Sequence, residues 1–407
     1  MKNLFLIIVL AIATCFQVDA QVIQLVPDET YGQGNNWDKI FDTYYDTLDG
    51  RPYGLRKQLV VFDDGKAMVS HATRNRYSLF DANGKFLKDI TLYFADKGKK
   101  PRNLQPVEGK LGNLYFTRAN NTGDIYLFDN NGLIVKELKI KYQALEMLAL
   151  DDHHIVIIGG TSWTKKWRNL VSILDTNTGK DKILCDVFED MNTDLKDKGY
   201  FIYTESKRND MKGRWQIAKV NNKLIVTNPI DGLVRTYDFN GNKISEKLLD
   251  WEPQTLSVKE QIALQNARIK DLKDELPRET EERVLRYYND FITYYENGIQ
   301  HIKEPINMGW FTMAIKGNDD NILFFGDAEV AGQNTFRIYS VSKGQSISTG
   351  SFQCEDYDLA LTKKRFVCHN GFYYGIQVLK NCDGMPLRLV RFRAEREMRH
   401  GRDDLAI

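Results

Sequence analysis

Cysteine and histidine are scarce in this sequence, which has five cysteines and six histidines among 407 residues. No Cys-x-x-Cys pair occurs, and no cysteine and histidine stand at the spacing of a structural zinc site. We therefore expect no metal and no other cofactor. Cys354, Cys368 and Cys382 lie close together in the sequence, so either one local disulfide, such as Cys354 to Cys368, or buried thiols would fit.

An excess of charge and a second long hydrophobic run are also missing. Lysine and arginine number 56, aspartate and glutamate number 55, and the net charge is +1. Because this balance gives no global field for nucleic acid or an anionic membrane, we expect no nucleic-acid partner. After the N-terminal segment, no run approaches the ~20 apolar residues of a transmembrane helix, so no membrane span is expected.

Residues 1–20 are typical of an export signal. Lys2 supplies a positive start, Leu4 to Ala13 is an apolar run, and Ala20 is a small residue at the expected cleavage site. We expect the mature chain to be exported, to the periplasm, the outer membrane or the cell exterior. A weak lipoprotein motif ends at Cys15, and a lipid anchor there stays an alternative.

One sequence pattern recurs along the mature chain. It consists of an alternating apolar run, an aspartate, a short polar turn with glycine, and a second run, and each copy predicts a β-hairpin. A further turn and strand precede each hairpin, which gives four short strands per unit. The copies of the hairpin are at 77–87, 125–132, 171–179, 234–241 and, more loosely, 336–344.

Four antiparallel strands at a period of roughly 40 to 50 residues favour radial repetition over a sandwich. We predict an all-β fold, a six-bladed β-propeller that fills residues 21–407. The blades are expected near 57–92, 104–140, 144–185, 213–250, 309–352 and 357–394, the last completed by residues 21–27.

The last unit lacks an outer strand of its own. Leu387 to Arg393 provides its third strand, whereas Glu395 to Arg402 is charged and shows no strand alternation. An open sheet edge needs a partner. We therefore predict that Val22 to Val26 pairs with Leu387 to Arg393 and closes the ring.

The turn Phe80-Asp81-Ala82-Asn83-Gly84-Lys85 resembles the blade-ending turns of exported six-bladed propellers of the NHL and TolB-like kind, which are abundant in Bacteroidota. The resemblance covers nearly all of the mature chain. It implies a fold and not an activity, because such families include sensors, binding scaffolds, lyases and lactonases.

The longest connection, 251–306, lies between the fourth and fifth blades and reads as a helical-hairpin insertion. Ser257 to Glu260 forms a capping box at the start of one helix, and a second helix begins near Thr280. Tyr288 and Tyr295 fall on the apolar side of the second helix. Packing on the propeller rim and docking of a partner both fit such a stripe.

A second candidate contact lies in the connection that we expect between Gly160 and Asn169. Two tryptophans in a polar loop expose apolar surface unless something covers them, and Trp and Arg dominate binding hot spots. Packing against neighbouring helices is the alternative. The candidate residues of this loop are Trp163, Lys165, Lys166, Trp167 and Arg168.

The expected inner strands are mainly apolar, with isolated acids at Glu108, Glu146 and Asp358. No Gly-x-Ser-x-Gly motif and no nucleophile–base arrangement occurs. The sequence thus predicts an exported, non-catalytic binding or scaffold protein that engages a protein or glycan through its insertion-rich face. The alternative is a lactonase-like hydrolase or lyase with its site at the mouth of the central channel. Enzymatic activity is left open, with its absence favoured.

Overall fold

The structure is a computed structural model of the whole chain. The expected export signal, Cys15, Lys165 and Cys382 lie outside the residues that it describes. Within those residues, no helix is long and apolar enough to cross a membrane. The described residues are 21–41, 58–71, 76–96, 101, 104–119, 122–163, 166–190, 198–212, 214–326, 334–355, 357–358, 366–379 and 387–396.

The described chain is mostly β, and four of its sheets are antiparallel meanders of four strands. Sheets of this kind are the units from which propellers are built. They are β2 Gln58–Val61, β3 Ala67–His71, β4 Arg76–Phe80 and β5 Phe86–Thr91; β6 Gly109–Leu111, β7 Leu114–Arg118, β8 Asp124–Phe128 and β9 Ile134–Lys139; β10 Gln143–Ala149, β11 His154–Trp163, β12 Lys166–Asp175 and β13 Lys180–Asp190; and β14 Gln216–Val220, β15 Lys223–Thr227, β16 Leu233–Tyr237 and β17 Lys243–Leu248.

The remaining large sheet has nine strands and contains two further groups. One is β20 Met313–Lys316, β21 Asn321–Phe325, β22 Thr335–Ser340 and β23 Gln345–Gln353. The other is β24 Tyr357–Asp358, β25 Phe366–His369, β26 Phe372–Leu379, β27 Leu387–Arg396 and the N-terminal strand β1 Gln21–Pro27.

The aspartate of the repeated pattern builds the hairpin turn. In the first copy, Asp81 Oδ1 accepts hydrogen bonds from the backbone N–H groups of Asn83 and Lys85, both at 2.9 Å. Gly84 follows at φ +76°, a conformation that other residues adopt only with strain. Asp129 makes the equivalent pair of bonds in the second copy. These carboxylates therefore serve turn formation, as the sequence pattern indicates.

Neighbouring sheets pack face to face through apolar side chains. Tyr77 of the first sheet stacks on Phe128 of the second, with ring centroids 5.9 Å apart. Trp215 and Leu224 belong to the cluster that joins the third and fourth sheets. The core thus lies between successive sheets, and the outer strand β5 keeps one face in solvent.

The first strands of the groups adjoin one another around a central space. Contacts join β6 to β10, β10 to β14, β14 to β20, β20 to β25, and β25 to β2. The side chains of Val60 in β2 and of Val107, which precedes β6, share one apolar cluster. A cavity bounded by all six strands follows from this arrangement.

The N-terminal strand pairs with the C-terminal one, as the sequence predicts, but its partners are Phe392–Arg396 and not the whole of Leu387–Arg393. β1 is antiparallel to β27, with Ile23 opposite Arg396 and Pro27 opposite Phe392. It is also parallel to β23, and this second pairing joins the last two groups into one sheet. Just beyond β1, the buried carboxylate of Asp28 accepts hydrogen bonds from the Arg391 guanidinium at 2.6 and 3.0 Å.

One detail of the last group differs from the sequence prediction. β27 continues to Arg396, although the charged residues after Arg393 suggested its end; Glu395 is exposed while the backbone pairs with β1. The strand of this group that lines the central cavity is β25, Phe366–His369. The inner strand predicted to begin near Leu359 stays a prediction. Residues 359–365, with Leu361, lie outside the described chain.

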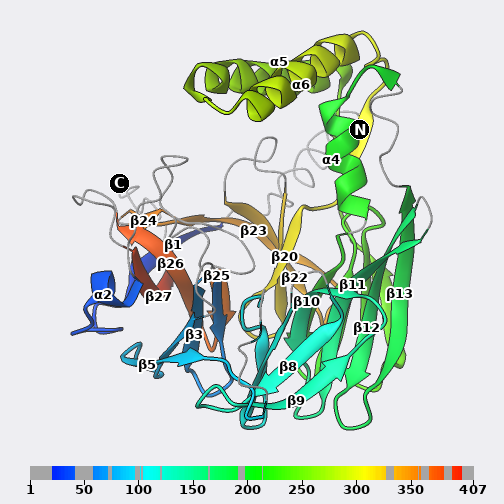
Figure 1. Cartoon of the computed structure of the whole chain (residues 1–407). Helices are drawn as coiled ribbons and strands as arrows, with labels where there is room; N and C mark the ends of the chain where they lie inside the picture. The colour runs from blue at the N-terminus through cyan, green and yellow to red at the C-terminus, as the bar shows by residue number, and fades with distance from the viewer. Residues whose placement is uncertain are drawn as a thin grey trace, which may run out of the picture.

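The long helices form one layer that stands off from the sheets (Figure 1). α5 Val258–Glu275 and α6 Glu282–Ile299 are joined by the short 3₁₀ turn η2 Leu276–Arg278, and β18 Gln254–Leu256 and β19 Ile306–Gly309 pair at their base. The predicted capping box at Ser257 is present. α4 Tyr203–Lys212 packs against α5 and connects this layer with β13.

A short N-terminal helix was not predicted from the sequence, and the state of the cysteines was left open there. The short helix α2 Trp37–Phe41 packs on the first and last groups of strands, with Trp37 stacked on Phe80. Cys354 and Cys368 are thiols and form no disulfide. Burial raises the pKa of the Cys368 thiol to about 12, so Cys368 is an inert packing residue.

Candidate functional site

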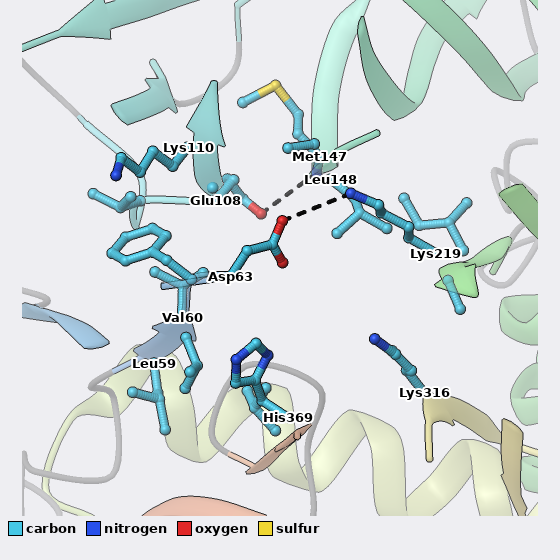
Figure 2. Close-up of a pocket in the computed structure, with 18 of the residues that line it drawn as sticks. Leu59, Val60, Asp63, Glu108, Lys110, Met147, Leu148, Lys219, Lys316 and His369 are labelled. Atoms are coloured by element: carbon cyan, nitrogen blue, oxygen red, sulfur yellow. Dashed lines mark hydrogen bonds and ion pairs between the residues drawn. The ribbon is translucent and has the colours of Figure 1, made fainter. Parts of the chain in front are cut away.

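A cavity of about 440 Å³ is enclosed by the first strands of five groups and by β25 of the last group. Figure 2 looks into it, and we call it the inner-strand cavity. It takes in the turns that follow three of these strands, at Asp63–Asp64, Gly112 and Asp152. Its mouth therefore lies at the short turns, whereas the helical insertion extends connections at the other end of the strands.

The walls of the inner-strand cavity are largely apolar. Val60, Met147 and Leu148 are among the side chains that Figure 2 shows around it, and Ile217 and Ile315 add to the lining. This agrees with the apolar inner strands expected from the sequence. A concave apolar wall with a few convergent polar groups is typical of sites for small molecules.

Charged side chains gather at the mouth. Lys219 Nζ lies 3.8 Å from Asp63 Oδ2, and Lys110 Nζ lies 3.3 Å from Asp64 Oδ2. Lys66 is a second partner of Asp64, at 3.1 Å. The Asp63 side chain is 95% exposed, so its pairing with Lys219 is weak and easily exchanged for another anion.

Lys316 and His369 complete the polar rim (Figure 2). Lys316 is exposed at the end of β20, and in the described residues no ion pair or hydrogen bond engages its ammonium group. His369 Nε2 is buried and has no hydrogen-bond partner in the described part of the structure. Burial lowers the pKa of the His369 imidazole, and the nearby Lys316 charge lowers it further, so the ring is neutral at pH 7.

A buried ion pair holds the wall between the second and third sheets. Arg118 Nε lies 3.4 Å from Glu108 Oε1, and both side chains are almost fully buried. Arg118 also donates a hydrogen bond to the Leu145 carbonyl, while Glu108 Oε2 accepts one from the Met147 N–H at 3.4 Å. Glu108 is thus a structural partner of Arg118 and not a solvent-facing catalytic acid.

Groups of three or more metal-binding side chains do not occur within the described residues. The lactonase-like alternative needs convergent oxygen or histidine ligands at the channel mouth, and Asp63, Asp64 and Asp152 instead have Lys219, Lys110 and the Gly112 N–H as partners. The described cavity therefore gives that alternative no support.

The candidate residues near Trp163 lie in a hairpin and not in a loop. β11 runs to Trp163 and β12 begins at Lys166, so the expected connection between Gly160 and Asn169 is wrong. The backbones stay paired because β12 also has β13 as a partner. The side chains of Trp163, Lys166 and Trp167, and the whole of Lys165, lie outside the described part. Arg168 Nη2 is 2.5 Å from Asp186 Oδ2.

The two predicted tyrosines occupy different environments on α6. Tyr295 is buried and meets the Phe201 ring edge-on, at 5.1 Å between centroids, so it packs within the helical layer. Tyr288 is half-buried in the same cluster. The neighbouring Tyr287, which the sequence argument did not select, is 54% exposed.

Lys219, Lys316 and His369 were also missed, because the sequence argument looked for acids and metal ligands on the inner strands. A signal for them exists. Each lies within two residues of the turn that ends its first strand, and side chains at such positions reach the mouth of a central cavity.

The sequence matches no family model and no curated protein. Among solved structures, the chain is similar to a member of the DUF4221 family from Bacteroides vulgatus, with 11% identity, 93% of this chain and 98% of that chain covered, and a TM-score of 0.43. For BamB from Moraxella catarrhalis the identity is 13%, the coverage 82% and 81%, and the TM-score 0.33. For a protein of unknown function from Bacteroides caccae the identity is 11%, 81% of this chain and 93% of that chain are covered, and the TM-score is 0.34. None of the three reaches a TM-score of 0.5, and the fold described above rests on the sheets of this chain alone.

Proposed function

We propose that the six groups of strands are the blades of a six-bladed β-propeller, closed by β1. Residues 251–306 are then a helical insertion between the fourth and fifth blades. The contacts of the six first strands around one cavity support the ring, and the pairing of β1 with β27 supports its closure. Because residues 1–20 are typical of an export signal, the proposal includes export of the chain from the cytoplasm.

We further infer that the chain is a non-catalytic binding protein whose partner docks on the insertion-rich face. The observation that carries this function is the aromatic surface of α6. Tyr287 is more than half exposed and lies against Phe291, with 4.4 Å between ring centroids. Phe291 in turn contacts Phe201 in the buried cluster, so the exposed ring stands on a rigid base. Exposed aromatic rings on rigid supports are common anchors of protein interfaces.

A protein suits this surface better than a glycan. Tyr287 is exposed on α6, and this helix stands off from the sheets (Figure 1). An amphipathic helix of this kind fits into a groove of another protein. Beside the base of the layer, α4 and residues 301–306 enclose a second hollow of about 390 Å³ with Arg208, Glu205 and His301 in its lining. Polar groups there would form the rim of such an interface.

The tip of the β11–β12 hairpin is a second part of the proposed contact. Its residues are Trp163, Lys165, Lys166, Trp167 and Arg168, and they belong to the same insertion-rich face by topology. Tyr288 adds to the α6 surface. Tyr295 supports that surface from beneath through Phe201.

Site-specific photo-crosslinking in cells that produce and export the chain tests this function. A photoreactive phenylalanine at position 287 should give a discrete protein adduct, because a docked partner lies against the exposed ring. The same group at Ile244, which is 53% exposed on β17, is the matched control and should give none. Purified chain should compete for the adduct, and chains with Tyr287→Ala or with Trp163→Ala and Trp167→Ala should compete less.

Equal labelling at positions 287 and 244, or full competition by every variant, contradicts the proposal. Binding of purified chain to glycans that Tyr287→Ala abolishes, without a protein adduct, would assign the surface to a glycan.

A further inference from the structure

The lining of the inner-strand cavity holds five carboxylates and three lysines, and two of these lysines, Lys219 and Lys316, are weakly engaged. Asp64 has Lys66 and Lys110, Glu108 has Arg118, and Asp152 accepts the Gly112 N–H. The ammonium group of Lys219 lies over the Phe239 ring, 5.8 Å from its centroid, and its ion-pair partner is the solvent-exposed Asp63 carboxylate. Lys316 and His369 Nε2 are not engaged in any ion pair or hydrogen bond of the described residues. Lys219 and Lys316 are therefore the cations at this mouth that can take up an added anion.

These groups converge because their strands are neighbours. Lys219 is on β14, Lys316 ends β20, and His369 ends β25, and contacts join β14 to β20 and β20 to β25. Figure 2 shows the side chains of Lys219, Lys316 and His369 around the same side of the cavity. Three strands from three different groups thus place two ammonium groups and one imidazole at one mouth.

His369 adds an observation that points to a ligand. Its Nε2 atom is shielded from water without a partner, and a buried polar atom of this kind is costly unless something bonds to it. The atom belongs to a residue that lines the cavity. A ligand atom at the mouth would supply the missing hydrogen bond once the imidazole turns toward the cavity.

The apolar wall beneath the polar rim determines what kind of ligand body the cavity can hold. Val60, Met147, Leu148 and Ile217 give an apolar lining, and a volume of about 440 Å³ accommodates a small molecule but no folded partner. Inorganic phosphate alone would leave this wall in contact with water. The geometry therefore calls for a charged head and an apolar body.

We propose that the inner-strand cavity binds a small organic carboxylate, whose head lies between Lys219, Lys316 and His369 and whose apolar body lies against Val60, Met147 and Ile217. This site is separate from the docking surface on α6. The carboxylate displaces Asp63 from Lys219, and Lys316 supplies its second positive charge.

Isothermal titration of the exported form of the chain with octanoate tests the site. Octanoate should bind, while acetate, which lacks the apolar body, and octylamine, which carries the opposite charge, should bind at least about tenfold more weakly. Lys316→Met and Lys219→Met should each weaken octanoate binding about tenfold, since each removes a charge-assisted contact. Lys316→Arg should retain binding.

Lys85→Met is the control, because Lys85 is an exposed lysine in a short hairpin turn outside the cavity and its loss changes net charge equally. It should bind octanoate like the unaltered chain. Octanoate binding that is absent, matched by octylamine, or unchanged in Lys316→Met and Lys219→Met would overturn the proposal. Photo-crosslinking at position 287 does not depend on this cavity, so either inference can fail alone.

Discussion

At the scale of single residues, Asp28 and Arg391 are the most consequential pair. The Asp28 side chain is 2% exposed, and the Arg391 guanidinium lies 4.7 Å from the ring centroids of both Tyr31 and Phe372. Burial acts to raise the Asp28 pKa, but hydrogen bonds from Thr30 and Arg391 outweigh it and hold the pKa below its usual value. The charged pair is thus fully enclosed by groups that favour it.

Asp28→Asn should lower the free energy of unfolding by about 3 kcal/mol at pH 7, because Arg391 keeps a buried charge without its counter-ion. Urea denaturation measures this. Glu282→Gln is the control: its pair with Arg286 is exposed, so the change should stay within about 0.5 kcal/mol. Equal effects of the two substitutions would contradict the role given to Asp28.

The same pair sets a dependence on pH. Because the folded pKa of Asp28 lies below its unfolded value near 3.8, the carboxylate stabilises the fold above about pH 4, and this contribution is lost as the pH falls through the folded pKa. Denaturation of the unaltered chain and of Asp28→Asn should therefore converge in stability below about pH 4. A constant difference down to pH 2 would exclude Asp28 as the cause.

At the scale of elements, one glutamine fixes the helical layer. Gln265 of α5 is fully buried, and its side-chain amide donates hydrogen bonds to the carbonyls of Phe201 and Tyr295 at 2.8 and 2.7 Å. Its oxygen accepts one from the Tyr203 N–H at 2.8 Å. A single side chain therefore joins α5, α6 and the start of α4.

Gln265→Leu should destabilise the helical layer by about 2–3 kcal/mol, because buried backbone groups lose their partners. Hydrogen exchange measured by mass spectrometry should then speed up in α4, α5 and α6 while the sheets stay protected. Asn266→Leu, at the next, exposed position, is the control and should leave exchange unchanged. Faster exchange throughout the chain would show that the layer does not unfold separately.

Sequence reasoning succeeded for elements that local chemistry determines. Asp81 and Gly84 specify their hairpin turn without help from distant residues, and Ser257 with Glu260 specifies a helix start. It failed where tertiary contacts decide. β27 continues past Arg393 only because β1 bonds to it, and α2 forms only where the first and last groups offer an apolar surface.

The candidate site was predictable in part. The apolar inner strands were expected, but the convergence of Lys219, Lys316 and His369 depends on which strands adjoin, and this is a property of the tertiary packing. The local sequence around a lysine near a turn does not show which residues lie opposite it across the cavity.

At the scale of the whole molecule, β1 acts as a shared strand. Gln24 lies opposite Gln353 of β23 on one side and opposite Glu395 of β27 on the other. A backbone N–H in a strand with two partners is always part of a ladder. The side chain of Gln24 is half-buried, so its own packing matters less than its backbone.

Gln24→Pro should therefore destabilise the chain by about 3 kcal/mol or more, because proline removes a ladder hydrogen bond from a central strand. Gln24→Ala keeps the N–H and should cost less than about 1 kcal/mol. Thermal unfolding followed by circular dichroism compares the two. Similar melting temperatures would mean that β1 is dispensable for closure.

The shared strand also imposes an order on synthesis. β1 leaves the ribosome long before β27, so the sheet that contains both cannot assemble until Arg396 has emerged. Contacts between such distant parts of a chain form slowly. A newly made chain with β27 incomplete keeps the edges of β1 and β23 exposed, and export while the chain is still growing would let closure occur only on the far side of the membrane.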